Sequence, residues 1–277
     1  MHVWMTRRSL PLLLTLVLLL VGCSPRRPAA RLPASTATSG PTPGQVATAG
    51  LPETSTNMPT PLPAIRTTPS LAATAVATGT GRVGVAGKLS IARASHSATL
   101  LPDGRVLIAG GCTRAGCEMG DDGATAEVYE PEASAFMPVG RMTTERVGHT
   151  ATLLATGQVL LAGGFDRHGV LATAELYAPA TGNFTAAGQM GSRRAGYTAT
   201  PLPSGKILLA GGFDGSRRLA SAELYDPTTG TFTPTGELRS PRAEHAAAAL
   251  PDGRVLVTGG SSDGEDVLAT AEVYDPT

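Results

Sequence analysis

Three histidines and one tyrosine recur along the chain, and imidazole is the side chain that most often binds metal in proteins. The four residues, separated by 53, 48 and 48 positions, are His96, His149, Tyr197 and His245. Each lies three residues after an arginine that recurs with the same spacing, so these residues follow a repeat rather than a separate metal motif. We expect each of them to cap a strand and to bond a neighbouring repeat. We predict no metal and no cofactor.

Two cysteines form the second group with distinctive chemistry. Cys112 and Cys117 lie in one segment, which carries an insertion of about five residues relative to the other repeats. In an exported chain, such a pair is expected to form a disulfide that holds its loop. A thiol redox site and a metal pair are the alternatives. No flanking cation or helix points to a lowered thiol pKa, and no further ligands are clustered nearby.

The sequence argues against catalysis and against nucleic acid binding. No nucleophile and base stand apart from the repeat as a lone constellation, so we predict no catalytic residue and no enzymatic activity. Residues 1–81 carry six arginines and one acidic residue, whereas residues 82–277 carry 16 Lys and Arg against 21 Asp and Glu. The folded part therefore lacks a basic stripe for a phosphate backbone, and we expect no nucleic acid partner.

The N-terminus has the organisation of an export signal. Two arginines precede an apolar run over residues 10–21, and the tetrad Leu20-Val21-Gly22-Cys23 closes it. This tetrad resembles the lipobox of bacterial lipoproteins, in which the Cys thiol receives a diacylglycerol before cleavage. The alternatives are a plain signal peptide and an uncleaved anchor, although the run is shorter than the roughly 20 residues that span a bilayer. We predict a signal peptide over 1–22 and a lipid on Cys23, which would hold the chain in the cell envelope, facing the extracytoplasmic side of a membrane.

The segment 23–80 is rich in Pro, Thr, Ala and Ser and contains no aromatic residue. Such a composition cannot bury enough apolar surface to offset the entropy of ordering, so we expect a disordered linker. Its threonines and serines could be glycosylated, which the sequence alone does not decide. We place the folded domain at 81–277.

Four landmarks recur in one phase through this domain, and a repeat of 48 to 53 residues predicts a repeat architecture. The first landmark is an arginine, namely Arg93, Arg146, Arg194 and Arg242. The second is a glycine pair, namely Gly110-Gly111, Gly163-Gly164, Gly211-Gly212 and Gly259-Gly260. The third is a tyrosine, namely Tyr129, Tyr177, Tyr225 and Tyr274, and the fourth is Phe136, Phe184 and Phe232.

Each repeat has the pattern of four short strands. In the second repeat, apolar and β-branched residues bounded by Pro, Gly and Asp turns place strands at 149–154, 158–162, 172–177 and 183–186. Four strands in about 48 residues correspond to one blade of a β-propeller. The predicted fold is therefore an all-β propeller of four repeats, either complete or part of a larger ring.

The landmarks resemble those of kelch repeats: an Arg and His that open the first strand, a Gly-Gly pair that ends the second, and a Glu-(Val/Leu)-Tyr segment in the third. The resemblance covers 80–277 and implies a kelch-type β-propeller. Kelch repeats usually have Trp in the last strand, where this chain has Phe, which can fill the same slot between blades. We expect the arginines to bridge blades through hydrogen bonds to backbone groups or to the recurring acids Glu127, Glu175, Glu223 and Glu272.

Variable loops on one face of the repeats are the candidate binding surface, because divergent loops on a rigid scaffold commonly carry function. Solvated turn residues chosen for backbone geometry are the simpler interpretation of any single member. The candidates are Asp121, Asp122, Arg141, Asp166, Arg167, His168, Arg193, Asp214, Arg217, Arg218, Arg239, Asp263, Glu265 and Asp266.

We therefore expect a membrane-anchored binding module that presents these loops to a protein or a glycan. Kelch propellers also resemble the catalytic domain of galactose-oxidase-like copper-radical enzymes, so such an oxidase or another propeller enzyme is one alternative, and a purely structural envelope protein is another. The sequence yields one further expectation. Residues 80–87 align with the last strand of the second repeat, so residues 82–86 are predicted to pair with the third strand of the fourth repeat and close the ring.

Overall fold

The computed structural model describes residues 82–277 except 115–116, 118–120 and 264–266. The predicted signal peptide at 1–22, the predicted lipid site at Cys23 and the linker at 23–80 lie outside the described residues. Residues from Val85 to Thr277 belong to one compact unit.

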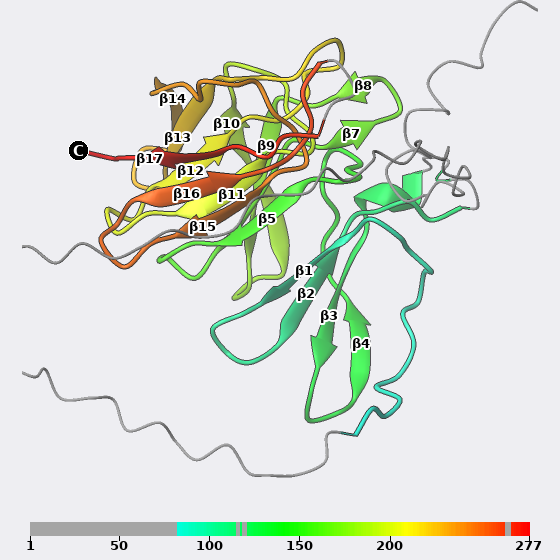
Figure 1. Cartoon of the computed structure of the whole chain (residues 1–277). Helices are drawn as coiled ribbons and strands as arrows, with labels where there is room; N and C mark the ends of the chain where they lie inside the picture. The colour runs from blue at the N-terminus through cyan, green and yellow to red at the C-terminus, as the bar shows by residue number, and fades with distance from the viewer. Residues whose placement is uncertain (1–81, 115–116, 118–120, 264–266) are drawn as a thin grey trace, which may run out of the picture. The chain divides into compact units, whose positions relative to one another are not determined.

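Each repeat folds into an antiparallel sheet, called a blade here and numbered in chain order (Figure 1). The first blade contains β1 (Ser97–Leu100), β2 (Val106–Ala109), β3 (Ala126–Glu130) and β4 (Ala135–Pro138). The second contains β5 (Thr150–Leu153), β6 (Val159–Ala162), β9 (Thr173–Ala178) and β10 (Asn183–Gln189). The third contains β11 (Thr198–Pro201), β12 (Ile207–Ala210), β13 (Ala222–Asp226) and β14 (Thr231–Thr235). The fourth contains β15 (Ala246–Ala249), β16 (Val255–Thr258) and β17 (Ala271–Tyr274).

Two short elements lie in the loops between second and third strands. The first blade has a 3₁₀ helix, η2 (Asp121–Ala124), and the second has a ribbon of β7 (Phe165–Asp166) and β8 (Gly169–Val170). The predicted four-stranded pattern is confirmed for the first three blades, and the strands of the second blade fall within a few residues of their expected bounds.

The expectation for ring closure is wrong in this structure. The fourth blade has three strands, and residues 82–86 form no strand with β17 or with any other described residue. The side chains of Val83 and Val85 are almost fully exposed. The alignment identified the local pattern of a last strand, but pattern alone does not bring two remote segments into register.

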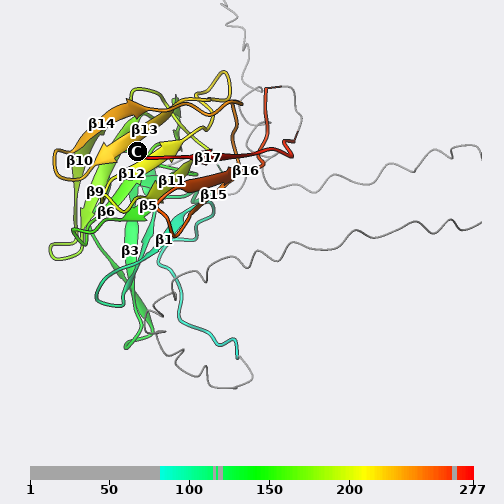
Figure 2. The same cartoon turned by 60° about the vertical axis from the view of Figure 1, so that its left-hand side comes forward.

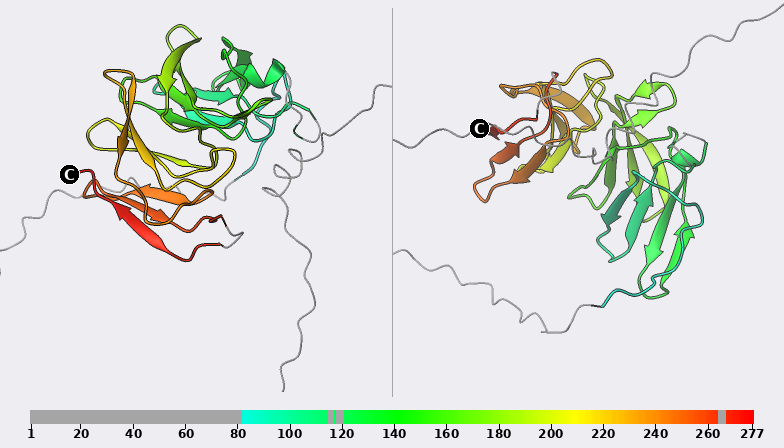
Figure 3. Two further views of the ribbon diagram at one scale, coloured as in Figure 1. Left: turned by 90° about the horizontal axis from the view of Figure 1, so that it is seen from above. Right: turned by 45° about the vertical axis from the view of Figure 1, so that its right-hand side comes forward.

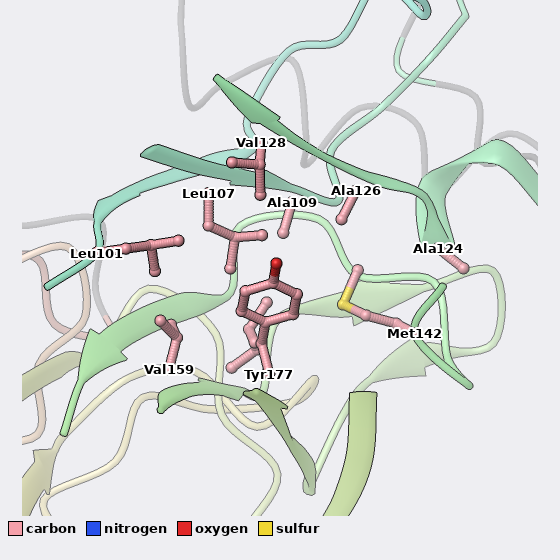
Figure 4. Packing of buried hydrophobic residues seen from close by; sticks show 10 residues of the cluster. Leu101, Leu107, Ala109, Ala124, Ala126, Val128, Met142, Val159 and Tyr177 are labelled. Atoms are coloured by element: carbon pink, nitrogen blue, oxygen red, sulfur yellow. The ribbon is translucent and has the colours of Figure 1, made fainter. Parts of the chain in front are cut away.

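The core is built from the faces of neighbouring blades, and β6 shows how. Its alternate residues point to opposite sides of the sheet. Val159 and Leu161 belong to the core shared with the first blade, whereas Leu160 and Ala162 belong to the core shared with the third. All four are buried, which explains why the strand is an unbroken apolar run. In Figure 4, Val159 lies in the first of these cores among residues of the first blade.

The blades follow one another in chain order, as the further views of Figure 3 show. Their first strands are neighbours, since β1 contacts β5, β5 contacts β11, and β11 contacts β15. At the other edge, the last strands β10 and β14 also contact each other (Figure 2). The tyrosine and phenylalanine landmarks pack against each other within a blade, with ring centroids of Tyr177 and Phe184 5.0 Å apart. Phe184 also packs against the core between the first two blades, as predicted for this slot.

The first three glycine pairs lie where one blade closely approaches the next. Gly211 has a φ of 63°, and a Cβ there would lie 2.6 Å from the carbonyl oxygen of Arg242 in the next repeat. The next amide, that of Gly212, donates to the same carbonyl at 2.8 Å. Only glycine combines this left-handed backbone with this approach. The pair therefore recurs for a geometric reason.

Candidate functional site

The side chains of the recurring arginines form hydrogen bonds within their own repeats. The buried guanidinium of Arg146 donates from Nη1 to the carbonyl oxygens of Gly163 and Thr173, at 3.2 and 2.7 Å. Its Nη2 donates to the Thr173 hydroxyl at 2.9 Å and to Glu175 at 3.0 Å. Glu175 also accepts from the backbone N–H of Thr143 at 2.7 Å, in the segment that leads into the same blade. All these partners belong to the second repeat or to the segment entering it.

This pattern corrects the expectation that the arginine side chains bridge blades. The same pairing within a repeat occurs at Arg93–Glu127, Arg194–Glu223 and Arg242–Glu272, with N–O distances of 3.1, 2.8 and 2.6 Å. The bond across the boundary comes from the arginine backbone instead, because its carbonyl accepts from the second glycine of the preceding blade. The arginines are therefore structural residues and leave no cation for a ligand.

The recurring histidine and tyrosine positions bond the preceding blade, as expected for three of the four. His149 Nε2 lies 2.8 Å from Ser97 Oγ, and His245 Nε2 lies 3.0 Å from Thr198 Oγ1. Tyr197 takes the same place with its hydroxyl 2.7 Å from Thr150 Oγ1. The fourth, His96, is exposed. Within the described ranges, no group of three or more His, Cys, Asp or Glu is placed to hold a metal ion.

Burial controls the charge of the histidines in this set. Although His149 as a whole is partly exposed, its Nδ1 is buried and has no hydrogen-bond partner. Burial, together with the nearby Arg146 cation as the second cause, lowers the pKa of His149 to about 3. Burial lowers the pKa of His245 to about 4 in the same way, with Arg242 as the second cause. Both rings are neutral at physiological pH and act as hydrogen-bonding spacers between blades.

Cys112 and Cys117 are joined by a disulfide bond, as predicted. Cys112 also pairs through its backbone with Ala94, at N–O distances of 2.8 and 2.9 Å, so one end of the loop is fixed to the start of the same repeat. Downstream of the bond, η2 carries Asp121 toward the second blade. Asp121 and Ala124 of η2 line the pocket described next.

A pocket of about 440 Å³ lies between the loops of the first and second blades, and it is called the loop pocket here. Its lining combines charged residues of both loops with the segment that joins the two blades, namely Asp121, Ala124, Arg141, Met142, Thr143, Thr144, Glu145, Asp166, Arg167 and His168. The volume is in the range of small-ligand sites. Five of the candidate residues from the sequence, Asp121, Arg141, Asp166, Arg167 and His168, meet in this pocket.

Arg167 organises the charges of the loop pocket. Its Nε donates to Glu145 Oε1 at 2.5 Å and its Nη2 to Glu145 Oε2 at 3.1 Å, so the two side chains pair through both carboxylate oxygens. The same Nη2 lies 2.7 Å from Asp121 Oδ1. Arg141 donates to the backbone carbonyl of Asp121. The hydrogen bond from Arg167 lowers the pKa of Asp121, so this carboxylate is ionised at neutral pH.

Glu145 is the site residue that the sequence analysis missed. Its side chain is 7% exposed and fixes Arg167, whose own side chain is 49% exposed. A signal was present, because the position before the recurring arginine holds Ala92, Arg193 and Pro241 in the other repeats. A carboxylate at this position occurs only in the second repeat. At this junction, the buried Glu145 carboxylate holds the loop of the second blade through Arg167.

The remaining candidates that the structure describes do not line the loop pocket. Asp214 pairs with Arg217 inside its own loop at 3.5 Å, and the backbone N–H of Arg218 donates to Asp263 at 2.7 Å. Asp122 lies in η2, Arg193 is exposed, and the backbone N–H of Arg239 donates to Glu272 at 2.6 Å. Glu265 and Asp266 lie outside the described residues. The candidate residues therefore divide into those that line the loop pocket and those that make separate contacts in other loops.

Comparison with known families gives one match. The Kelch motif matches residues 194–239, which begin at the buried Arg194 and include all four strands of the third blade. The chain has kelch-repeat character. The other blades have the same antiparallel strand order as the third blade, apart from the fourth strand, which the last blade lacks within the described residues. The fold is therefore that of a kelch-type β-propeller. No curated protein matches the chain. Among the residues that the structure describes, the kelch-type blades include no helix of sufficient length and apolarity to cross a membrane.

Proposed function

We propose that this chain is a non-catalytic, membrane-anchored binding module that holds a ligand in the loop pocket, on the extracytoplasmic side of a membrane. The observation that carries the proposal is the loop pocket itself. The residues that recur in the repeats build the blades, whereas five of the variable loop residues, together with Glu145, meet in this pocket. The ligand is proposed to be a protein or a glycan.

The contacts of the tyrosines and cysteines support a non-catalytic role. The hydroxyls of Tyr177 and Tyr225 are buried without a hydrogen-bond partner. A copper-radical oxidase would need two tyrosines, two histidines and a cysteine bonded to one of the tyrosines. Here Tyr177 lies in the core between blades, and the cysteine sulfurs are bonded to each other.

A site-specific crosslink tests where the ligand binds. His168 and Ser216 occupy matched turns, because each donates its backbone N–H to an aspartate two residues earlier, at 2.7 and 2.8 Å. A photo-reactive residue would be placed at either position of the full-length chain in cells. A discrete adduct from position 168, lost on Arg141→Ala and absent from position 216, is the expected result. Equal labelling from both positions would contradict binding in the loop pocket.

The anchor has a separate test. Cells that express the full-length chain would be labelled with a palmitate analogue, and the wild type would be compared with Cys23→Ala. Label in the wild type and none in the variant is expected. Equal label in both proteins would reject lipid anchoring at Cys23, whereas the proposal of ligand binding in the loop pocket would stand.

A further inference from the structure

Arg167 holds two carboxylates that differ in how firmly they are fixed. Glu145 has a side chain that is 7% exposed, and it pairs with Arg167 through both of its oxygens. Asp121 has a side chain that is 86% exposed, and it meets Arg167 at a single nitrogen. An exposed ion pair contributes little, because water competes for both ions. The Asp121 side chain can therefore leave Arg167 at small cost, whereas Glu145 cannot.

A second guanidinium stands beside the exposed carboxylate. Arg141 donates to the backbone carbonyl of Asp121 and lines the loop pocket together with Arg167. A planar guanidinium matches a carboxylate in geometry and can bind it through two parallel hydrogen bonds. A carboxylate at the position of the Asp121 side chain thus bonds Arg167 directly and lies near the guanidinium of Arg141.

We propose that the loop pocket takes an acidic peptide segment, whose carboxylate replaces the Asp121 side chain on Arg167 and is also held by Arg141. The inference rests on the proposed function and names the chemistry of its ligand. The lining favours a peptide over an acidic glycan, because none of the lining residues is Trp, Tyr or Phe and a sugar ring has no aromatic face to stack on. In the free protein, Asp121 occupies the place of the ligand.

Binding of a defined peptide to the full-length chain in detergent tests this inference. The probe is a fluorescent hexaglutamate peptide, with hexaglutamine as the uncharged control and hexagalacturonate as the acidic glycan. Hexaglutamate alone is expected to bind, and added salt should weaken it because the contacts are charged. Arg141→Gln should weaken binding by about tenfold or more, as expected for a charge-assisted hydrogen bond. Arg141 is exposed, so this variant is expected to fold.

Asp121→Asn is the decisive variant. If Asp121 occupies the ligand's place, its removal as a competitor tightens hexaglutamate binding several-fold. Asp263→Asn is the control, since it makes the same charge change at an aspartate that contacts Arg218 between the third and fourth blades, outside the loop pocket. It should leave binding within about twofold, because a remote exposed charge is screened.

The outcomes separate this inference from the proposed function. Weaker binding in Asp121→Asn would make Asp121 a ligand contact and overturn the replacement. If hexagalacturonate binds and hexaglutamate does not, the proposal of a peptide ligand is overturned. No binding of either probe, with the crosslink from position 168 still formed, would reject the acidic ligand and leave the proposed function in place. Loss of the crosslink as well would reject both.

Discussion

Nε2 of His149 lies 2.8 Å from the hydroxyl oxygen of Ser97, across the boundary between the second blade and the first. The imidazole bonds through one nitrogen, while its other nitrogen is buried and unpaired. A proton on this ring would bring a charge into a buried place beside Arg146. The boundary between the first two blades therefore depends on a neutral histidine.

Acid should weaken the fold through this residue. The folded-state pKa of His149 is lowered to about 3, below its unfolded value, so the unfolded chain binds the proton first. Stability is then present above about pH 6.5 and is lost as the pH falls toward 3. Between pH 7 and pH 4 the loss from this group is on the order of 2–3 kcal/mol. Urea unfolding at both pH values would measure it.

The third repeat supplies a matched variant for this prediction. Tyr197 makes the equivalent bond with a hydroxyl that does not titrate in acid, so His149→Tyr should keep the contact and lose the pH dependence. Carboxylates titrate in both proteins, which is why the difference between wild type and variant is the quantity of interest. An identical acid loss in the two proteins would show that His149 is not responsible.

Gly211→Ala should destabilise the chain more than Gly259→Ala. Both glycines have a φ near 65°, at 63° and 66°. A Cβ at Gly211 would overlap Arg242 of the next repeat, whereas at Gly259 the nearest atom is the Leu268 carbonyl oxygen at 3.6 Å. The left-handed backbone costs both alanines about 1–2 kcal/mol, and the overlap adds roughly 1–3 kcal/mol at Gly211. Equal midpoints in urea would mean that the blade boundary tolerates a methyl group.

Arg146→Met should cost about 3–5 kcal/mol, because it leaves the buried Glu175 carboxylate without its cation. Arg254→Met provides the comparison. Arg254 pairs with Asp252 at 2.6 Å with both side chains about half exposed, so its loss should have little effect on stability because water screens the pair. Thermal or urea unfolding of the two variants would measure the contrast. Similar losses would indicate that the arginine–glutamate pair contributes no more than a surface pair.

The Cys112–Cys117 bond should matter for the loop more than for the fold. It closes a loop with a sequence separation of 5, for which chain entropy predicts about 2 kcal/mol of stabilisation. The double variant Cys112→Ala, Cys117→Ala should fold, yet it should give less adduct from position 168, because η2 and Asp121 follow this loop. Unchanged crosslinking in the variant would separate the disulfide from the loop pocket.

Much of the fold could be predicted from the sequence because its residues repeat. The recurrence of Tyr177 and its equivalents fixed the phase of the strands, and the glycine pairs marked where blades touch. The partner of a side chain was harder to predict. The spacing of the landmarks does not encode whether the Arg146 side chain bonds within its own blade or reaches a neighbouring one. Glu145 was missed because a single departure from a repeat resembles ordinary surface variation.

The alternation of β6 between two cores has a consequence for how such a chain can change. The second and third blades each separate two cores, and alternate side chains of their second strands enter one core or the other. A whole repeat could therefore be duplicated, and every core would still have two compatible walls. Insertion of one residue within Val159–Ala162 would instead move the strand residues that follow it to the opposite face of the sheet. Their side chains would then point into the other core. Over evolutionary time, this architecture should change its length by entire blades and its chemistry through the loops.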